Sequence, residues 1–263
     1  MDAATDTSLL SPAERPAARL HNAGGRGQAV LVCEHASRFI PASLANLGLD
    51  EEAQTSHAAW DIGALEVAQS LSEGLDAPLV AARISRLVYD CNRPPEAPDT
   101  IPAQSERFAV PGNAALTEAQ RAARVREVYE PFSALVSDTI DRHRGVPVLI
   151  TVHSFTPVYL GRRRRVEIGV LHDDDTRLAD AMLACADRHT PLIVGRNDPY
   201  GPADGVTHTL RRHAIACNLA NVMLEIRNDL LPDRKARRGM ARMLAGWLGE
   251  AMEKIGKQGC RST

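Results

Sequence analysis

The sequence predicts a single α/β domain, a three-layer α/β/α sandwich around a mixed, mainly parallel sheet. From about residue 28 onward, short apolar runs rich in Val, Leu and Ile alternate with amphipathic patterns of helical period. This alternation is typical of a parallel sheet covered by helices on both faces. The 263 residues, 44% of them hydrophobic, suffice for one large core, and no repeat or long linker divides the chain.

Six apolar runs have the length and composition of buried strands. Each is bounded by turn-forming or polar residues, and the run over 147–152 is the strongest candidate for a central strand. The predicted strands are residues 28–33, 78–84, 147–152, 166–171, 191–194 and 221–226.

Four segments between and after these strands have helical patterns. One covers 51–75 and ends near Gly74, because glycine commonly terminates helices. Thr117 and Gln120 have the spacing of a capping box, so a long helix is expected from there towards His143, kinked or split at Pro131. The remaining helices are predicted over 176–189 and from near Pro232 onward.

The charge and the N-terminal sequence exclude several classes of protein. The formal net charge is 31 − 33 = −2, so no general attraction to nucleic acid or membrane is expected. Residues 1–26 are rich in Ala, Pro, Gly and polar residues, which predicts a flexible N-terminal arm before one domain over 27–263. The arm lacks the basic start and apolar stretch of a signal peptide. A cytoplasmic protein is therefore expected.

The cysteine pattern agrees with that compartment. The five cysteines are scattered and form no C-x-x-C pair, so neither a zinc knuckle nor a disulfide framework is indicated. They are Cys33, Cys91, Cys185, Cys217 and Cys260.

Polar residues capable of catalysis follow the predicted strands. In parallel sheets ligands bind beyond the carboxyl ends of the strands, so these residues are expected to converge on one edge. Glu225 is distinctive because it interrupts an apolar run, and a buried carboxylate costs several kcal/mol unless it is paired or functional. The candidates are Glu34, His35, Arg86, Asp90, Asn92, Arg93, His153 and Glu225.

Two imidazoles, a carboxylate and an open position for water describe a catalytic zinc site. Such a metal lowers the pKa of bound water towards about 7, and a nearby glutamate can take the proton. Asn92 and Arg93 together offer a forked donor for a carboxylate, which implies an anionic substrate. Taken singly, a histidine at a strand end is more often a hydrogen-bonded structural residue, so it is the joint placement that indicates a site.

Several blocks in the same order resemble the N-formylglutamate amidohydrolase family, over about residues 28–232. The resemblance implies a phosphorylase/hydrolase-like fold, distantly similar to zinc carboxypeptidases and to the aspartoacylase and succinylglutamate desuccinylase group. It also implies a single amidohydrolase domain that hydrolyses N-formyl-L-glutamate to formate and L-glutamate, as in some bacterial histidine degradation. The blocks are EHAS (34–37), HAAWDIG (57–63), SRLVYDCNR (85–93), VHSF (152–155), EIGVL (167–171) and EIRND (225–229).

Residue by residue, the resemblance puts His35 and His153 on a metal, Zn²⁺ or another divalent ion. It makes Glu225 the general base for water and later the general acid for the leaving amine. It assigns the substrate α-carboxylate to the Asn92–Arg93 pair, and Arg86 to the same anion or to the developing oxyanion.

The third metal ligand is left open by the sequence. Zinc carboxypeptidases supply their first two ligands as His-x-x-Glu, whereas Arg38 stands three residues after His35. Asp61 is the first candidate because it lies in a family-like block. Glu34 is the second, although neighbours on a strand point in opposite directions, and Asp90 is the third.

Two further features are ambiguous. The run Arg162–Arg165 is either a solvated loop between strands or a positive mouth that attracts a dianion. His213 lies in a segment that also resembles the family, but a structural role is the simpler interpretation.

Two rival functions remain. One is an amidohydrolase or peptidase for another N-acyl amino acid or a short peptide, and the other is a metal-free carboxylate-binding protein that has lost catalysis. In every case the expected partner is a small anionic N-acyl compound, without nucleic acid or membrane, and the sequence is compatible with a homo-oligomer.

Overall fold

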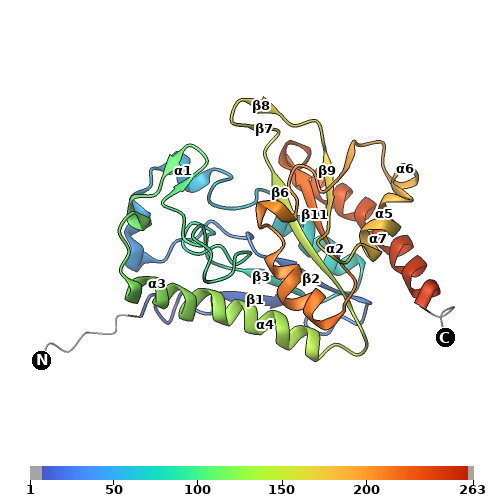
Figure 1. Cartoon of the computed structure of the whole chain (residues 1–263), viewed down its shortest axis with the longest axis horizontal. Helices are drawn as coiled ribbons and strands as arrows, with labels where there is room; N and C mark the ends of the chain where they lie inside the picture. Colours follow the sequence, from blue (N-terminus) through green and yellow to red (C-terminus); the bar gives the residue numbers. More distant parts are fainter. Residues whose placement is uncertain (1–7, 260–263) are drawn as a thin grey trace, which may run out of the picture.

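A seven-stranded mixed sheet runs through the centre of the molecule (Figure 1). The computed structural model describes residues 8–259, and the sheet order is β1-β3-β2-β6-β11-β9-β10. Strands β3, β2, β6 and β11 are parallel to one another, while β1 and β9 run antiparallel to β3 and β11. The predicted mixed, mainly parallel sheet is therefore confirmed. The strands are β1 (Ala18–His21), β2 (Ala29–Cys33), β3 (Leu79–Ala82), β6 (Val148–Phe155), β9 (Ile168–Leu171), β10 (Val194–Arg196) and β11 (Asn221–Arg227), with two small hairpins, β4 (Gln104–Ser105) with β5 (Phe108–Ala109) and β7 (Val158–Tyr159) with β8 (Arg162–Arg163).

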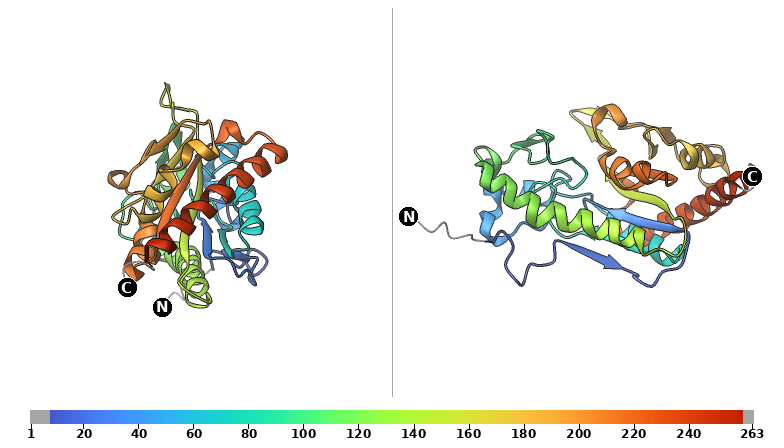
Figure 2. Two further views of the ribbon diagram at one scale, coloured as in Figure 1. Left: turned by 90° about the vertical axis from the view of Figure 1, so that its right-hand side faces the viewer. Right: turned by 60° about the horizontal axis from the view of Figure 1, so that its bottom comes forward.

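Helices cover both faces of the sheet, as the three-layer prediction requires. One core contains side chains from α2, α5 and α7, and the other contains side chains from α4 and the turn η5. Figure 2 shows α7 and the α3–α4 helix on opposite sides of the molecule. The α-helices are α1 (Glu51–Thr55), α2 (Ala64–Gly74), α3 (Glu118–Arg124), α4 (Glu130–Asp141), α5 (Arg177–Leu183), α6 (Ala186–His189) and α7 (Arg234–Gly259), and the short helical turns are η1 (Ala42–Gly48), η2 (Pro111–Asn113), η3 (Val125–Tyr129), η4 (Pro202–Asp204), η5 (Leu210–Ala214), η6 (Ile215–Cys217) and η7 (Asn228–Leu230).

Alternation along the buried strands divides them between the two cores. In β2, Ala29, Leu31 and Cys33 belong to the core under α2 and α7, whereas Val30 and Val32 belong to the core under α4. Successive side chains of a strand point to opposite faces, so a fully apolar run is the sequence required for a strand covered on both sides.

The helix predicted over 51–75 is wrong as one element, because it is two helices with a break between them. Asp50 caps α1 through its side chain, and α2 begins after Gly63 and ends at Gly74. Gly63 has φ +81°, and a Cβ there would lie 2.9 Å from Leu231 Cβ, so both conformation and space favour glycine. The break places Asp61 in a loop rather than on a helix.

The long helix after Thr117 begins with the predicted capping box. The wide turn η3 divides the helix into α3 and α4, and Pro131 lies directly after this turn, in the first turn of α4. The amide hydrogen that proline lacks is least needed there.

Residues 8–26 of the predicted arm make contacts with the rest of the protein. Leu9 and Leu10 are buried in the core, and their backbone N–H groups donate to the Glu127 carboxylate at 3.0 and 3.2 Å. Strand β1 then pairs with β3 at the edge of the sheet. A composition rich in Ala and Pro concealed these two anchoring leucines. Residues 1–7, the start of the predicted arm, and residues 260–263, with Cys260, lie outside the described residues.

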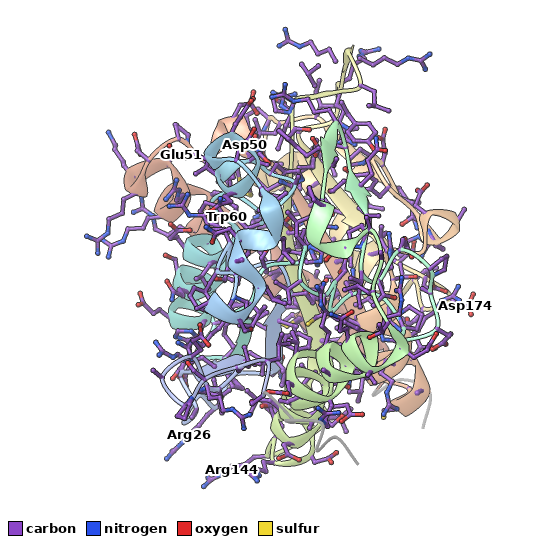
Figure 3. All side chains as sticks on the ribbon, turned by 90° about the vertical axis from the view of Figure 1, so that its left-hand side faces the viewer. Arg26, Asp50, Glu51, Trp60, Arg144 and Asp174 are labelled. Atoms are coloured by element: carbon purple, nitrogen blue, oxygen red, sulfur yellow. The ribbon has the colours of Figure 1, made fainter. Side chains whose placement is uncertain are left out.

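The two ends of the parallel strands lie at opposite ends of the molecule. Arg26 and Arg144, which precede β2 and β6, lie at the end of the molecule away from the β7–β8 hairpin (Figure 3). That hairpin follows β6 and so marks the carboxyl end of the strands. Among residues 8–259, no helix combines the length and the hydropathy that crossing a membrane requires.

The packing of the N-terminal segment gives a stability prediction. Leu10→Ala should lower the free energy of unfolding by about 2–5 kcal/mol, the usual cost of emptying a buried leucine site. Denaturant unfolding measures this change, and Val146→Ala is the control because Val146 is 82% exposed. A Leu10→Ala protein as stable as the control variant would mean that this segment is not anchored in solution.

Candidate active site

A cavity of about 950 Å³ opens at the carboxyl end of the central strands. Loops after β2 and β3, the α1–α2 break, strands β6 and β11 and the β7–β8 hairpin all contribute to its wall. All but one of the candidate residues from the sequence line this one cavity. Glu34 does not, and those that do are His35, Asp61, Arg86, Asp90, Asn92, Arg93, His153 and Glu225.

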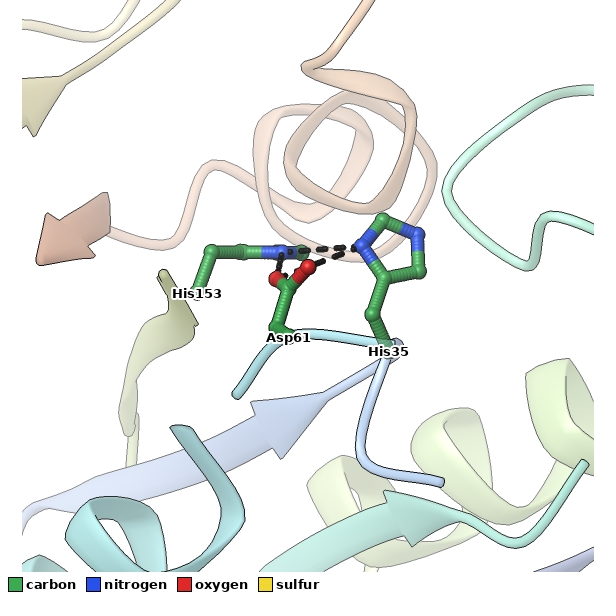
Figure 4. A group of neighbouring side chains, drawn as sticks. All are labelled: His35, Asp61 and His153. Carbon is green, nitrogen blue, oxygen red and sulfur yellow. Dashed lines mark hydrogen bonds and ion pairs between the residues drawn. The ribbon is translucent and has the colours of Figure 1, made fainter. Parts of the chain in front are cut away.

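Three of these side chains meet at one point (Figure 4). His153 Nδ1 lies 2.9 Å from Asp61 Oδ2 and 3.2 Å from His35 Nδ1, and His35 Nδ1 lies 3.4 Å from the same Asp61 oxygen. All three residues are buried, and together they form a group that could hold a metal ion.

The far side of each imidazole faces a second carboxylate. His35 Nε2 lies 2.7 Å from Asp90 Oδ1, and His153 Nε2 lies 3.1 Å from Glu34 Oε2. A carboxylate hydrogen-bonded to an imidazole favours the proton on the bonded nitrogen, so Asp90 favours a lone pair on His35 Nδ1 that faces Asp61. Glu34 contacts His153 as an ion pair without hydrogen-bond geometry. The three atoms that meet at Asp61 can all accept, so they require a shared proton or a cation between them.

The donor set and its spacing fit zinc. Two imidazole nitrogens and one carboxylate oxygen are typical ligands of a catalytic zinc ion, which keeps its fourth position open. Bonds of about 2.0–2.1 Å in a tetrahedron separate neighbouring ligands by about 3.3 Å. The observed separations are 2.9, 3.2 and 3.4 Å, so little movement would be needed.

Glu34 and Asp90, the second and third candidates for the missing ligand, do not belong to the group. Each contacts a histidine from behind, a position from which a carboxylate can orient an imidazole and raise its basicity. Burial alone would lower the pKa of His153, but Glu34 and Asp61 raise that pKa well above the usual range.

Asp61 is held in its position from several directions. Its backbone N–H donates to the carbonyl of His35 at 2.9 Å, and Oδ2 accepts from the backbone N–H of Ser154 at 3.2 Å. Burial would raise the pKa of this carboxyl group, but His35 and His153 hold that pKa well below its usual range. His57 lies 3.8 Å from the other oxygen, and burial lowers its pKa to about 4.

Arg86 is already engaged within the protein. Its two terminal nitrogens lie 3.3 Å from Asp61 Oδ1 and 3.1 Å from Asp90 Oδ2, so the fork ties the two carboxylates together. The side chain is still 26% exposed towards the cavity. Its main contacts are therefore with carboxylates of the protein, whereas a residue that binds an anionic ligand is expected to keep its donors free.

Asn92 and Arg93 differ in how far they are engaged. Asn92 Nδ2 donates to the carbonyl of Val206 at 2.5 Å and Oδ1 accepts from the backbone of Thr209 at 3.0 Å, so this amide fixes a distant loop. Arg93 donates from Nε to Asp99 at 2.9 Å. Its terminal nitrogens make no hydrogen bond within residues 8–259, which leaves them available in the cavity.

Glu225 lies beside the histidine group. It pairs in register with His153 on β6 and with Gly169 on β9. A side chain at position 169 would crowd Glu225, because a Cβ on Gly169 would lie 3.1 Å from Glu225 Cβ and 2.5 Å from the Asp198 carbonyl oxygen. Burial, reinforced by Asp61, raises the pKa of Glu225 to about 7. Its Oε2 is buried without a hydrogen-bond partner in the described chain. A carboxyl group in this state is suited to exchanging protons.

The sequence did not identify Tyr200, whose hydroxyl accepts a hydrogen bond from Arg164 at 2.7 Å inside the same cavity. It lies in an irregular segment without a strand-end pattern, so no sequence signal marked it. Of the run Arg162–Arg165, Arg164 is half-buried and the other three are exposed, although all four reach the cavity wall. His213 packs near Ser133 and Ser137 under α4 and does not line the cavity.

An α/β/α sheet with such a polar group at the carboxyl ends of its strands has the arrangement of a ligand-binding or catalytic site. The family model described as N-formylglutamate amidohydrolase matches residues 27–231, and the chain belongs to this family. Membership of this family supports the assignment of the protein as an amidohydrolase.

Two solved structures show the same fold. The gene product Atu2144 from Agrobacterium tumefaciens is 52% identical with a TM-score of 0.92, over 94% of this chain and 99% of that one. The N-formylglutamate amidohydrolase from Ralstonia eutropha JMP134 is 19% identical with a TM-score of 0.62, over 92% of this chain and 98% of that one. A comparison with curated proteins gives no match.

The geometry gives a prediction about metal binding. We expect one zinc ion per chain in metal analysis of the purified protein, and loss of that ion in Asp61→Ala. Asp90→Asn should weaken zinc binding by about 10–100-fold, because it removes the charge that orients His35 but leaves the three proposed ligands in place. Asp187→Asn, an exposed substitution on α6, is the control. Unchanged zinc affinity in Asp61→Ala would exclude this site.

Proposed function

We propose that the protein is a metal-dependent amidohydrolase that cleaves N-formyl-L-glutamate to formate and L-glutamate. The observation that carries the proposal is the convergence of His35, Asp61 and His153 next to the unpaired carboxyl group of Glu225. Family membership supports the same reaction class. In bacterial histidine degradation, the setting that the family resemblance implies, this reaction would release glutamate in the cytoplasm.

His35, Asp61 and His153 would hold the metal. A zinc ion there supplies a Lewis acid that polarises the formyl carbonyl and lowers the pKa of water. Glu34 and Asp90 keep the two imidazoles in the ligating orientation, and Arg86 holds Asp61 and Asp90 in place.

Glu225 moves the proton. Its ionised carboxylate accepts a proton from water as the water oxygen forms a bond to the formyl carbon. The protonated Glu225 then gives this proton to the amide nitrogen as the C–N bond breaks. The products are formate and L-glutamate, whose amino group is now free. A pKa of about 7 suits a group that must both accept and donate near neutral pH.

The cationic wall of the cavity places the substrate. Arg93, with free terminal nitrogens, binds the α-carboxylate, while Asn92 supports the loop over this position. The exposed part of Arg86 lies beside the candidate metal ligand Asp61, where it can stabilise negative charge developing on the carbonyl oxygen. Fixing the anion brings the amide within reach of Glu225, which is the entropic part of catalysis.

One observation favours a larger N-acyl substrate as the second candidate. The cavity of about 950 Å³ is at the top of the range of about 300–1,000 Å³ typical of sites for drug-sized ligands. N-formylglutamate, an amino acid with a one-carbon acyl group, would leave part of it open. Comparing formyl, acetyl and succinyl derivatives of glutamate decides between these substrates.

Formate release tests the proposal directly. The purified protein should release formate from N-formyl-L-glutamate, lose this activity after chelation and regain it when zinc is added. Zinc bound without formate release would redirect the search to the other acyl groups. If the protein neither binds zinc nor releases formate, a carboxylate-binding protein without catalysis would be favoured.

The role of Glu225 gives a second test. Glu225→Gln keeps the size of the side chain but cannot accept the proton, so turnover should fall by about 10²–10⁴-fold. The zinc content and the unfolding midpoint should stay near those of the unmodified protein. Glu73→Gln, an exposed change on α2, is the control. Near-normal turnover in Glu225→Gln would show that Glu225 does not move the proton and would contradict the proposed mechanism.

A further inference from the structure

Arg164 is the half-buried member of the arginine run, and three aromatic rings hold its guanidinium group. The guanidinium carbon lies 4.6 Å from the centre of the Tyr159 ring, 4.7 Å from that of Tyr200 and 5.4 Å from that of Phe155. Nη1 also reaches the carbonyl of Thr156 at 3.4 Å. A guanidinium group stacked in this way is oriented before any ligand arrives.

The positive charge of Arg164 has no carboxylate partner within residues 8–259, although Asp198 lines the same cavity. The other two arginines near the reacting groups differ from it. Arg86 contacts two carboxylates and Arg93 contacts one. A cation on a cavity wall that lacks an internal counter-ion is suited to binding an anion from outside.

Tyr200 adds a second donor at the same place. Arg164 Nη2 donates to the Tyr200 hydroxyl oxygen at 2.7 Å, and arginine cannot accept a proton in return. The hydroxyl hydrogen of Tyr200 makes no hydrogen bond within the described chain. The free N–H groups of Arg164 and the O–H group of Tyr200 therefore provide two neighbouring donors, as the two oxygens of a carboxylate require.

This pair lies near the reacting end of the cavity. The charges of Glu225 and Arg86 both act on the pKa of Tyr200. The charge of Arg164 lowers the pKa of His57, which lies next to Asp61. Arg93 belongs to a different segment, after β3, and stands beside Gly205. The cavity thus offers two separate cationic positions, each with free donors.

We propose that Arg164 and Tyr200 bind the side-chain carboxylate of the substrate and so select N-acyl glutamate over N-acyl glutamine. The inference rests on the proposed function, in which Arg93 binds the α-carboxylate. A glutamate moiety carries two carboxylates separated by its side chain, and two cationic positions match that dianion. The side-chain amide of glutamine carries no negative charge, so it cannot neutralise the Arg164 cation and is bound less well than a carboxylate.

The test compares two substrates on matched variants. Arg164→Gln should lower kcat/KM for N-formyl-L-glutamate by about 100-fold, as expected when one partner of a buried charge pair is removed. It should change kcat/KM for N-formyl-L-glutamine by less than about 3-fold, because that substrate never used the charge. Tyr200→Phe keeps the ring and should lose about 10-fold on the glutamate substrate alone, the value of one hydrogen bond to a charged group.

Arg144→Gln is the control, since it removes the same charge from an exposed position at the opposite end of the molecule and should change either value by less than about 3-fold. An equal loss on both substrates in Arg164→Gln would show that Arg164 only holds the hairpin, and would overturn the inference. The inference would also be wrong if Arg144→Gln matched Arg164→Gln.

A binding measurement separates this inference from the reaction. Calorimetric titration with glutarate and with its monoamide needs no turnover, so it decides the inference even if no formate is released and the proposed function fails. We expect the unmodified protein to bind glutarate more tightly and Arg164→Gln to remove that preference. Equal affinities for the two compounds in the unmodified protein would contradict the inference.

Discussion

The contact between His35, Asp61 and His153 is the constraint on which the rest of the site depends. Three hydrogen-bond acceptors within 2.9–3.4 Å of one another repel unless a proton or a cation lies among them. The surroundings act to keep this arrangement in place. Asp90 and Glu34 fix the outer nitrogens of the two imidazoles, and Arg86 ties Asp61 to Asp90.

The fold provides the rigidity that such a cluster requires. His153 and Glu225 stand side by side on β6 and β11, two central strands buried on both faces. Gly169 on β9 leaves the space that Glu225 needs on its other side. Asp61 and His35 come from loops, and the αL conformation of Gly63 together with the backbone contact between Asp61 and His35 holds these loops in place. Two central strands thus carry His153 and Glu225, and the loops that carry the other groups are held by contacts of their own.

The cationic groups fall into two kinds that their sequence positions do not reveal. Arg86 neutralises the protein's own carboxylates, whereas Arg93 and Arg164 keep donors free for a ligand. Residue type alone would treat these arginines as equivalent. Their partners make the difference, and partners are defined by the folded chain.

The sequence by itself determined the α/β/α class, because apolar runs buried on both sides and amphipathic segments between them allow few other arrangements. The same alternation placed eight polar residues at one edge of the sheet, and all of them except Glu34 line the cavity. It could not show that Asp61, rather than Glu34 or Asp90, meets the two histidines, since all three carboxylates lie near the same strand ends. Nor could it show that Leu9 and Leu10 anchor the N-terminal segment, or which arginine keeps its charge free. Those outcomes depend on contacts between residues far apart in the chain, and only the tertiary structure decides such contacts.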